Sequence, residues 1–294
     1  MPIRLAVAAS LSCLTPESLA RFKEAGFESV EFSLDAATGV KPALATAGLT
    51  AACIDTDVAL HLPNRREWDS ARETLLRAIE AAAAIGAPVV RVFGYEVPKG
   101  EGLSSCMGRI GARLAPLGEI AAKAGVSIAI QNAGSFVHAR DIWQLLETIA
   151  HPRIGVCLDA GASAAVGESS ALAVPTLNTR IVHVHMWDHK DGKPAPLGQG
   201  SAGNKVLVER LRGIGYGGAI SLARQTDAQL ANVEYLKASV ILLKTWLGLI
   251  TPEPPKVEPA KTDTAKPAAT APKAPAAAKP AAATDAPAAS PPQA

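Results

Sequence analysis

The sequence lacks the features that mark membrane proteins, disulfide-rich proteins and nucleic-acid-binding proteins. Its 29 basic and 27 acidic residues leave a formal net charge of +2 at pH 7, so a surface that follows a phosphate backbone is not expected. No apolar run comes near the ~20 residues that a membrane-spanning helix needs. We therefore expect neither a nucleic acid nor a membrane as partner.

Cysteine pairs and nucleotide-binding motifs are missing as well. The four cysteines are widely spaced and form no CxxC pair, and they are Cys13, Cys53, Cys106 and Cys157. Reduced thiols in a cytoplasmic protein are the expected state. No GxGxxG follows the first apolar segment, and no Walker-type loop occurs in the chain, which excludes the two commonest phosphate-binding signatures.

The first residues combine a basic side chain with a short apolar run, as a signal peptide does. Arg4 precedes LAVAAS, but Ser10, Ser12 and Thr15 interrupt the apolar stretch. Targeting segments lie outside the fold, whereas IRLAVAAS supplies the first strand of the alternating pattern that follows. We expect this segment to belong to the folded domain.

Composition divides the chain near residue 250. Residues 1–250 hold every aromatic residue and all six histidines, whereas 251–294 hold 11 of the 22 prolines and 16 alanines. A segment so poor in large apolar groups buries too little surface to offset the conformational entropy of ordering it. We predict a disordered Ala/Pro/Lys-rich tail over 251–294. The remaining body carries 24 basic and 23 acidic residues and is nearly neutral.

Strand-like and helix-like segments alternate eight times along residues 1–250, as in a parallel sheet covered by helices. The length suits a single (β/α)8 barrel, and a doubly wound sheet is the alternative. The predicted strands are 3–9, 28–33, 49–54, 88–93, 126–131, 154–158, 180–185 and 218–222. The predicted helices are 15–26, 66–86, 103–124, 138–150, 163–177, 203–213 and 227–247.

Four predicted strands in the second half end in residues suited to binding a metal and a sugar. They are VSIAIQN, IGVCLDAGA, IVHVHMWD and AISLAR, and their ends carry Gln131, Asp159, His185 and Ala223. In barrels, residues that carry chemistry lie at the carboxyl ends of the strands. We therefore expect these four positions to meet at one mouth of the barrel.

These segments resemble the sugar phosphate isomerase/epimerase family, the xylose isomerase-like TIM barrels, which read alEn, lDtgH, vHlkD and lslE at the matching places. The resemblance covers residues 1–250. It implies a divalent ion (Mn, Mg, Co or Zn) held by two glutamates, an aspartate and a histidine. It also implies proton transfer by the glutamates on a ketose or aldose whose oxygens the ion polarises. Asp159 and His185 match family ligands and are predicted metal-binding and catalytic residues.

The chain departs from the family pattern at the carboxylates. Gln131 replaces the first glutamate, and its amide oxygen can coordinate a hard cation but cannot accept a proton at neutral pH. Ala223 replaces the second glutamate and supplies neither ligand nor base, while Ala162 and Gln199 replace two further family residues. We predict a weak or vestigial metal site of Asp159, His185 and Gln131, which are also the three candidate catalytic residues. The family reaction is predicted to be weakened or lost.

Four further residues are predicted to bind the substrate, which the resemblance implies to be a small sugar or polyol. Glu31 in GFESVEFS and Arg91 in PVVRVFG match the family's GfdgvEl and vvRvfgG. A buried salt bridge is the alternative role of Glu31. Trp187 is suited to stacking on a sugar ring, and Asp188 matches the aspartate of HlkD and is expected to orient the loop that follows.

Three functions compete on these grounds. The first is a divergent sugar isomerase or epimerase with a remodelled metal site. The second is a non-catalytic barrel that binds a sugar, a polyol or a protein partner. The third is a nuclease like the endonuclease IV branch of the fold, which needs several zinc ions and many acidic and histidine ligands. This chain has too few such residues at its strand ends, and its neutral body disfavours DNA.

Overall fold

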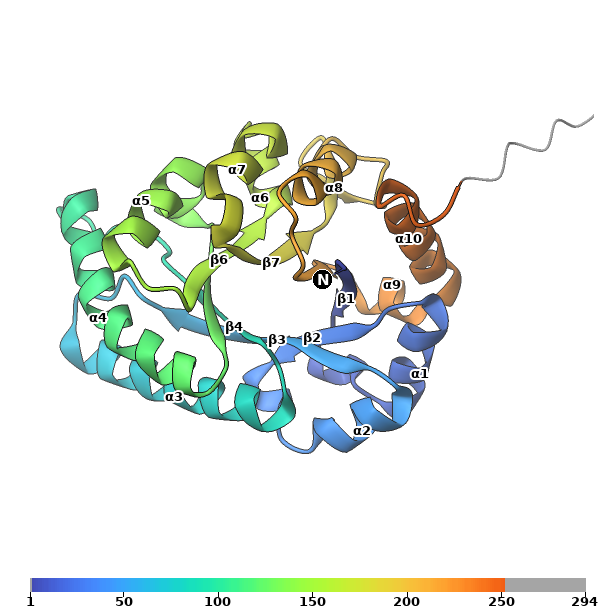
Figure 1. The fold of residues 1–294 in the computed structure, drawn as a ribbon, viewed down its shortest axis with the longest axis horizontal. Coiled ribbons are helices and arrows are strands. Elements are labelled where there is room, and N and C mark those ends of the chain that lie inside the picture. The colour runs from blue at the N-terminus through green and yellow to red at the C-terminus, as the bar shows by residue number, and fades with distance from the viewer. Residues whose placement is uncertain (1, 252–294) are drawn as a thin grey trace, which may run out of the picture. The chain divides into compact units, whose positions relative to one another are not determined.

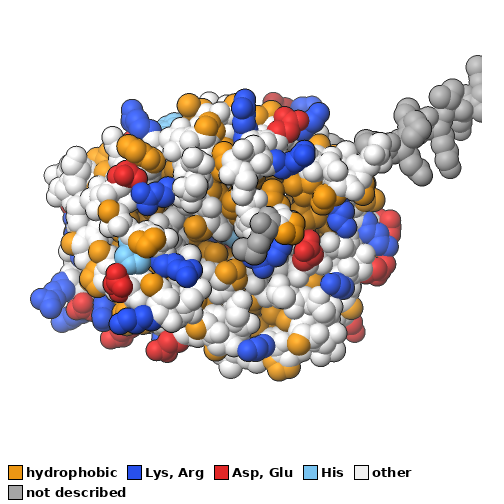
Figure 2. All heavy atoms as spheres, in the orientation of Figure 1, with side chains coloured by type: hydrophobic (Ala, Val, Ile, Leu, Met, Phe, Trp, Pro, Cys, Tyr) orange, Lys and Arg blue, Asp and Glu red, His pale blue; other side chains and the backbone are white. Residues whose placement is uncertain are grey.

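The computed structural model describes residues 2–251 (Figure 1). The tail predicted over 251–294 lies outside the described residues, apart from Thr251 itself. Charges of both signs are interspersed over the face seen in Figure 2, where Lys and Arg side chains alternate with Asp and Glu. Among residues 2–251, no helix is both long enough and apolar enough to cross a membrane.

Eight parallel strands close into a barrel in the order β1-β10-β7-β6-β5-β4-β3-β2, and the helices surround it (Figure 1). The predicted (β/α)8 TIM barrel is confirmed. The barrel strands are β1 (Arg4–Ala8), β2 (Ser29–Ser33), β3 (Thr50–Ala59), β4 (Val89–Phe93), β5 (Ser127–Gln131), β6 (Ile154–Asp159), β7 (Ile181–Met186) and β10 (Ala219–Leu222). Two short strands that the sequence did not predict, β8 (Asp188–Lys190) and β9 (Lys193–Ala195), form an antiparallel hairpin after β7.

Ten α-helices and four short 3-10 helices occur in the described part. The α-helices are α1 (Pro16–Ala25), α2 (Val40–Ala47), α3 (Arg65–Ile85), α4 (Leu103–Lys123), α5 (Ala139–Ile149), α6 (Ala160–Ala165), α7 (Ser170–Leu177), α8 (Asn204–Gly213), α9 (Asp227–Ala231) and α10 (Val233–Trp246). The 3-10 helices are η1 (Leu11–Cys13), η2 (Leu34–Ala36), η3 (Gly134–Phe136) and η4 (Asn178–Arg180).

Two predicted helices are each divided in the structure. The segment 163–177 is interrupted at Gly167, whose φ of +82° is a left-handed conformation that ends α6. The segment 227–247 is interrupted at Asn232, whose side chain accepts hydrogen bonds from the backbone of Glu234 and Tyr235 and so starts α10. Local capping chemistry therefore overrides the continuous apolar pattern at both places.

The main hydrophobic core lies between the strands and the surrounding helices, and two small clusters are separate from it. Ala6, Ala52 and Ala219 form one of these clusters, and Cys53, Val89, Ala129 and Cys157 form the other. All four cysteines of the chain are buried and unpaired. The interior of the barrel is thus built from small side chains and thiols, which leaves room for a polar network.

Candidate functional site

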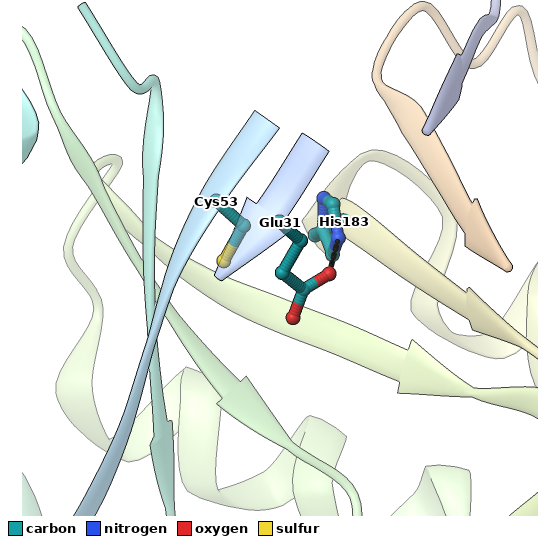
Figure 3. A group of neighbouring side chains, drawn as sticks. All are labelled: Glu31, Cys53 and His183. Carbon is teal, nitrogen blue, oxygen red and sulfur yellow. Dashed lines mark hydrogen bonds and ion pairs between the residues drawn. The ribbon is translucent and has the colours of Figure 1, made fainter. Parts of the chain in front are cut away.

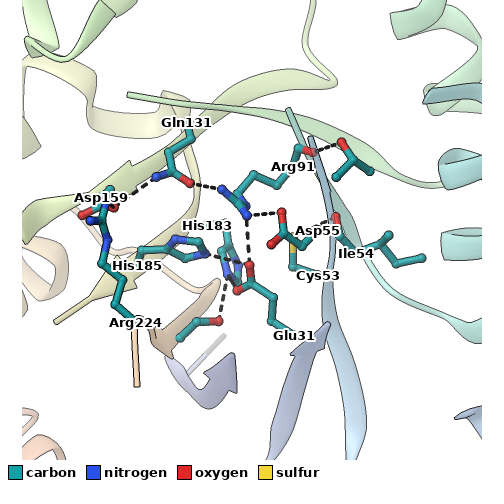
Figure 4. A network of polar contacts seen from close by, with 12 residues as sticks. Glu31, Cys53, Ile54, Asp55, Arg91, Gln131, Asp159, His183, His185 and Arg224 are labelled. Carbon is teal, nitrogen blue, oxygen red and sulfur yellow. Dashed lines mark hydrogen bonds and ion pairs between the residues drawn. The ribbon is translucent and has the colours of Figure 1, made fainter. Parts of the chain in front are cut away.

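A buried polar network fills the barrel toward the carboxyl ends of its strands (Figure 4). Parallel pairing places Asp159 opposite His185 and Gln131 opposite Cys157. Because side chains alternate along a strand, residues two apart share the inner face. The network comprises Glu31 from β2, Asp55 from β3, Arg91 from β4, Gln131 from β5, Asp159 from β6, and His183 and His185 from β7.

Glu31 is the centre of the network. Its side chain is buried, and its two oxygens lie 2.7 Å from Nε2 of His185 and 2.9 Å from Nε2 of His183. Burial acts to raise the pKa of Glu31, but the neighbouring His185 and His183 hold that pKa well below its usual range. Burial likewise opposes the charge on His185, yet Cys157 and Glu31 raise the His185 pKa well above its ordinary value. Glu31 and His185 therefore form a buried ion pair.

His183 differs from His185 although both contact Glu31. Burial lowers the pKa of His183, in spite of the attraction to Glu31, so this imidazole is neutral. Its Nε2 also lies 3.0 Å from the hydroxyl of Ser221 on β10. Its Nδ1 is buried and has no hydrogen-bond partner among the described residues.

Arg91 on β4 links Glu31 to side chains on the two neighbouring strands, β3 and β5. Its guanidinium forms an ion pair with Asp55 and donates a hydrogen bond to the Gln131 side-chain oxygen. Its Nε lies 3.7 Å from Glu31 Oε1. Burial opposes the charge, but the carboxylates of Asp55 and Glu31 raise the pKa of Arg91 above its ordinary value. Arg91 is thus a permanent cation inside the barrel, matched by the carboxylates around it.

Asp159 is fully buried, and its carboxylate accepts four hydrogen bonds. The donors are Gln131 Nε2 at 3.0 Å, Trp187 Nε1 at 2.6 Å, Arg224 Nη2 at 3.2 Å and the backbone of Ala162 at 2.8 Å. The Arg224 guanidinium also lies over the Trp187 ring, 4.3 Å from its centroid. The aspartate predicted as a metal ligand is therefore held by the chain's own donors.

Asp188 organises the loop after β7. Its buried carboxylate accepts backbone hydrogen bonds from His189, Gly198, Gly200 and Ala202 at 2.9–3.1 Å. A side chain at Gly200 would meet this carboxylate at 2.1 Å, so the close approach requires glycine. This arrangement suits the expected role of Asp188 in orienting the loop, and its part in substrate binding stays a prediction.

The structure brings Gln131 into contact with Asp159, whereas His185 contacts Glu31 instead. Sequence reasoning missed two charged residues of the network, Asp55 and Arg224. Asp55 was detectable, because it lies two residues after Cys53 on the same strand face. Arg224 was not, because its left-handed φ of +57° departs from the strand geometry that alternation assumes.

The predicted ligand set does not fit a hard divalent ion. Both ends of the Gln131 amide are occupied, by Arg91 and Asp159, and Asp159 carries the Arg224 guanidinium. Hard cations bind six or more oxygen ligands with carboxylates among them, and Ala223 offers none. Among the described residues, Glu31, Cys53 and His183 do form a group whose ligand atoms lie within 4.8 Å of one another (Figure 3).

Two hollows border the network. One, of about 230 Å³, is lined by Glu31 and Asp55 together with residues at the carboxyl ends of β1 and β2. The other, of about 340 Å³, is lined by Trp187, His189 and Arg224 together with α6 and the β8–β9 hairpin. The carboxylates and the half-exposed guanidinium are therefore within reach of a small polar molecule.

Comparison with known proteins agrees with this fold. The family model described as xylose isomerase-like TIM barrel matches residues 19–246. An uncharacterized protein of Methanocaldococcus jannaschii is 22% identical over 224 residues, which cover 69% of this chain and 74% of that protein.

Solved structures share the fold at low identity. A xylose isomerase domain protein from Planctomyces limnophilus has a TM-score of 0.69 at 15% identity and covers 85% of this chain and 99% of its own. An L-ribulose 3-epimerase has a TM-score of 0.70 at 18% identity, with 84% and 95% covered. A D-psicose 3-epimerase from Clostridium cellulolyticum has a TM-score of 0.69 at 13% identity, with 83% and 99% covered.

Proposed function

The chain belongs to the xylose isomerase-like TIM barrel family, and we propose that it binds a small sugar or polyol at the carboxyl end of its barrel. The family reaction, a metal-assisted proton transfer on a ketose or aldose, is weakened or lost. The observation that carries this proposal is the ion pair of Asp159 with Arg224. A guanidinium on this carboxylate takes up the negative charge that a divalent ion would need.

Charge at the outer end of the site supports the same proposal. A divalent ion placed on Asp159 would approach the guanidiniums of Arg224 and Arg91, and Gln131 and Ala223 bring no negative charge in return. The ion and the guanidiniums would repel one another, most strongly where water is excluded. Sugar hydroxyls have the opposite property, because they accept hydrogen bonds from guanidinium groups and donate them to carboxylates.

The groups available to a sugar line the two hollows. Glu31 and Asp55 line the smaller hollow, while Arg224 and Trp187 line the larger one. Arg224 covers one face of the Trp187 ring, so that face is not free to stack on a sugar. Arg91 is buried beneath these groups and holds Asp55 in place.

A metal-independent isomerase or epimerase is the second candidate function. It is favoured by the Glu31–His185 pair, in which a buried carboxylate and imidazole lie 2.7 Å apart. Such a pair can move a proton, provided that the substrate carbon comes within hydrogen-bond reach. The pair would then replace the two family glutamates as acid and base.

Titration of chelator-treated full-length protein with L-ribulose and D-psicose, read by calorimetry, tests the proposal, and product sugars are assayed by NMR. We expect saturable binding without added metal. Arg224→Ala should weaken it, whereas Arg140→Ala, which removes an exposed arginine on α5, should not. Product formed without metal and lost in Glu31→Gln would favour the second candidate. Binding or turnover that requires Mn²⁺ would refute both.

A further inference from the structure

A carboxylate, a thiol and an imidazole meet inside the barrel at Glu31, Cys53 and His183 (Figure 3). Glu31 and Cys53 are paired neighbours on β2 and β3, and His183 lies across the barrel on β7. His183 precedes His185 by two residues, which places it nearer the amino ends of the strands. We propose that Glu31, Cys53 and His183 form a binding site for a thiophilic divalent ion, of the Zn²⁺ class.

The donor set selects this kind of ion. Oxygen, nitrogen and sulfur ligands together are typical of zinc, whereas magnesium, calcium and manganese prefer oxygen alone. Zinc bonds of about 2.0–2.3 Å place tetrahedral ligands about 3–4 Å apart. The ligand atoms here lie within 4.8 Å of one another, so a small inward shift brings all three into bonding range.

The ion would take the place of a hydrogen bond that the structure already contains. Glu31 Oε2 and His183 Nε2 are 2.9 Å apart, and a metal between them replaces the shared proton. The Ser221 hydroxyl, 3.0 Å from the same nitrogen, marks where a water or hydroxyl would complete the coordination.

The charges of the site balance when the ion binds. A divalent ion with the Glu31 carboxylate and the Cys53 thiolate carries no net charge. Burial raises the pKa of the Cys53 thiol well above its ordinary value, so the ion must displace this proton to solvent when it binds. The His185 imidazolium, 2.7 Å from Glu31, must lose its proton as well, whereas Arg91 is matched by its ion pair with Asp55. This differs from the outer site, the group of Asp159, Gln131 and His185 at the carboxyl ends of the strands. There Asp159 would be the only carboxylate beside the ion.

A cavity at the amino-terminal end of the barrel borders this group at His183. It has a volume of about 360 Å³, and its lining includes His183, Ala52 and Ala219. For Nε2 to bind an ion, the imidazole proton must sit on Nδ1, the buried atom that lacks a partner among the described residues. Water in the cavity would accept a hydrogen bond from that N–H, as outer-shell groups do at zinc sites.

Cobalt substitution tests the site directly. Chelator-treated full-length protein is titrated with Co²⁺, and near-ultraviolet absorption reports a sulfur–cobalt bond. We expect a saturable charge-transfer band that excess Zn²⁺ removes. Cys53→Ser should abolish the band and weaken Zn²⁺ binding by more than the about 10–100-fold that loss of an outer-shell contact costs. Cys106→Ser, which alters a buried cysteine on α4, is the matched control and should keep the band.

Three results would overturn the proposal. The first is the absence of a sulfur–cobalt band in the wild-type protein, a measurement that needs no variant. The second is a band that survives in Cys53→Ser or in Cys53→Ala, with circular dichroism confirming that each variant is folded. The third is ion binding that Asp159→Ala removes and Cys53→Ser leaves intact, which would place the ion in the outer site.

Discussion

Arg224 Nη2 lies 3.2 Å from Asp159 Oδ2, so the aspartate that matches a family metal ligand is paired with a cation of the chain itself. The residue before Arg224 is Ala223, which stands where the family carries a glutamate. Loss of the carboxylate and arrival of the guanidinium thus occur at adjacent positions, and both act against a divalent ion.

Restoring both lost carboxylates should restore metal binding. In Gln131→Glu combined with Ala223→Glu, we expect Mn²⁺ to raise the melting temperature, because an ion that binds the folded state alone stabilises it. Each single variant should respond little, since one new carboxylate leaves the ion short of charge and ligands. The double-mutant cycle is read by thermal unfolding with and without Mn²⁺. A full response from either single variant would contradict this account.

Removing Arg224 should have little effect on stability but a clear effect on the site. Its side chain is 54% exposed, and Asp159 keeps three other hydrogen-bond donors when Arg224 is removed. We expect Arg224→Ala to melt within a few degrees of the wild type and to bind Mn²⁺ more tightly, because the competing cation is gone. Arg224→Lys, which keeps the charge, should bind Mn²⁺ as the wild type does. Equal Mn²⁺ affinity in all three proteins would exclude competition by this side chain.

Glu31 should be a main determinant of stability. Breaking a buried ion pair by removing one partner costs about 3–5 kcal/mol, so Glu31→Gln should lower the free energy of unfolding by an amount of that order. Urea denaturation in the presence of chelator measures it. Glu28→Gln is the control. It changes an exposed glutamate directly before β2 and should change stability by less than about 0.5 kcal/mol.

The cost of Glu31→Gln should also depend on pH. The pKa of Glu31 is lowered in the folded state, so its contribution is lost as pH falls below its ordinary value of 4.5. The pKa of His185 is raised above its ordinary value of 6.5, so its contribution is lost as pH rises through the folded-state pKa. The difference in stability between wild type and variant should therefore be largest between pH 4.5 and pH 6.5. A difference that grows steadily from pH 6 to pH 9 would contradict the ion pair.

Asp188 is expected to stabilise the loop after β7. Hydrogen bonds to a charged group contribute about 1.5–3 kcal/mol, and Asp188→Asn turns an acceptor into a donor that faces backbone N–H groups. We expect a loss of stability in that range. Asp191→Asn is the matched control, because Asp191 is exposed in the same hairpin and its left-handed conformation suits asparagine. An equal effect of the two changes would remove the special role of Asp188.

The fold was predictable because each barrel strand is a short apolar run that ends in Gly or polar residues. Asp159 and His185 were predictable from the segments LDAG and VHMWD, which keep the family pattern. The contact of Glu31 with both histidines was not, because it joins residues more than 150 positions apart through the closure of the barrel.

The deeper Glu31–Cys53–His183 group also escaped prediction. Its geometry depends on an irregularity in the β2–β3 pairing between Val30 and Glu31, which sets Glu31 opposite Cys53. Widely spaced cysteines give no spacing signal, and no local motif reports such a shift in register. The role of Arg224 was hidden for a related reason, since a single left-handed residue redirected its side chain.

Calorimetric titration of the chelator-treated, full-length wild-type protein with Mn²⁺ tests the central claim most directly. The account predicts no tight binding of this hard ion, because Arg224 occupies Asp159, and Gln131 and Ala223 supply no carboxylate. A submicromolar Mn²⁺ site that Asp159→Ala abolishes would contradict it. That result would favour a metal-dependent isomerase or epimerase instead.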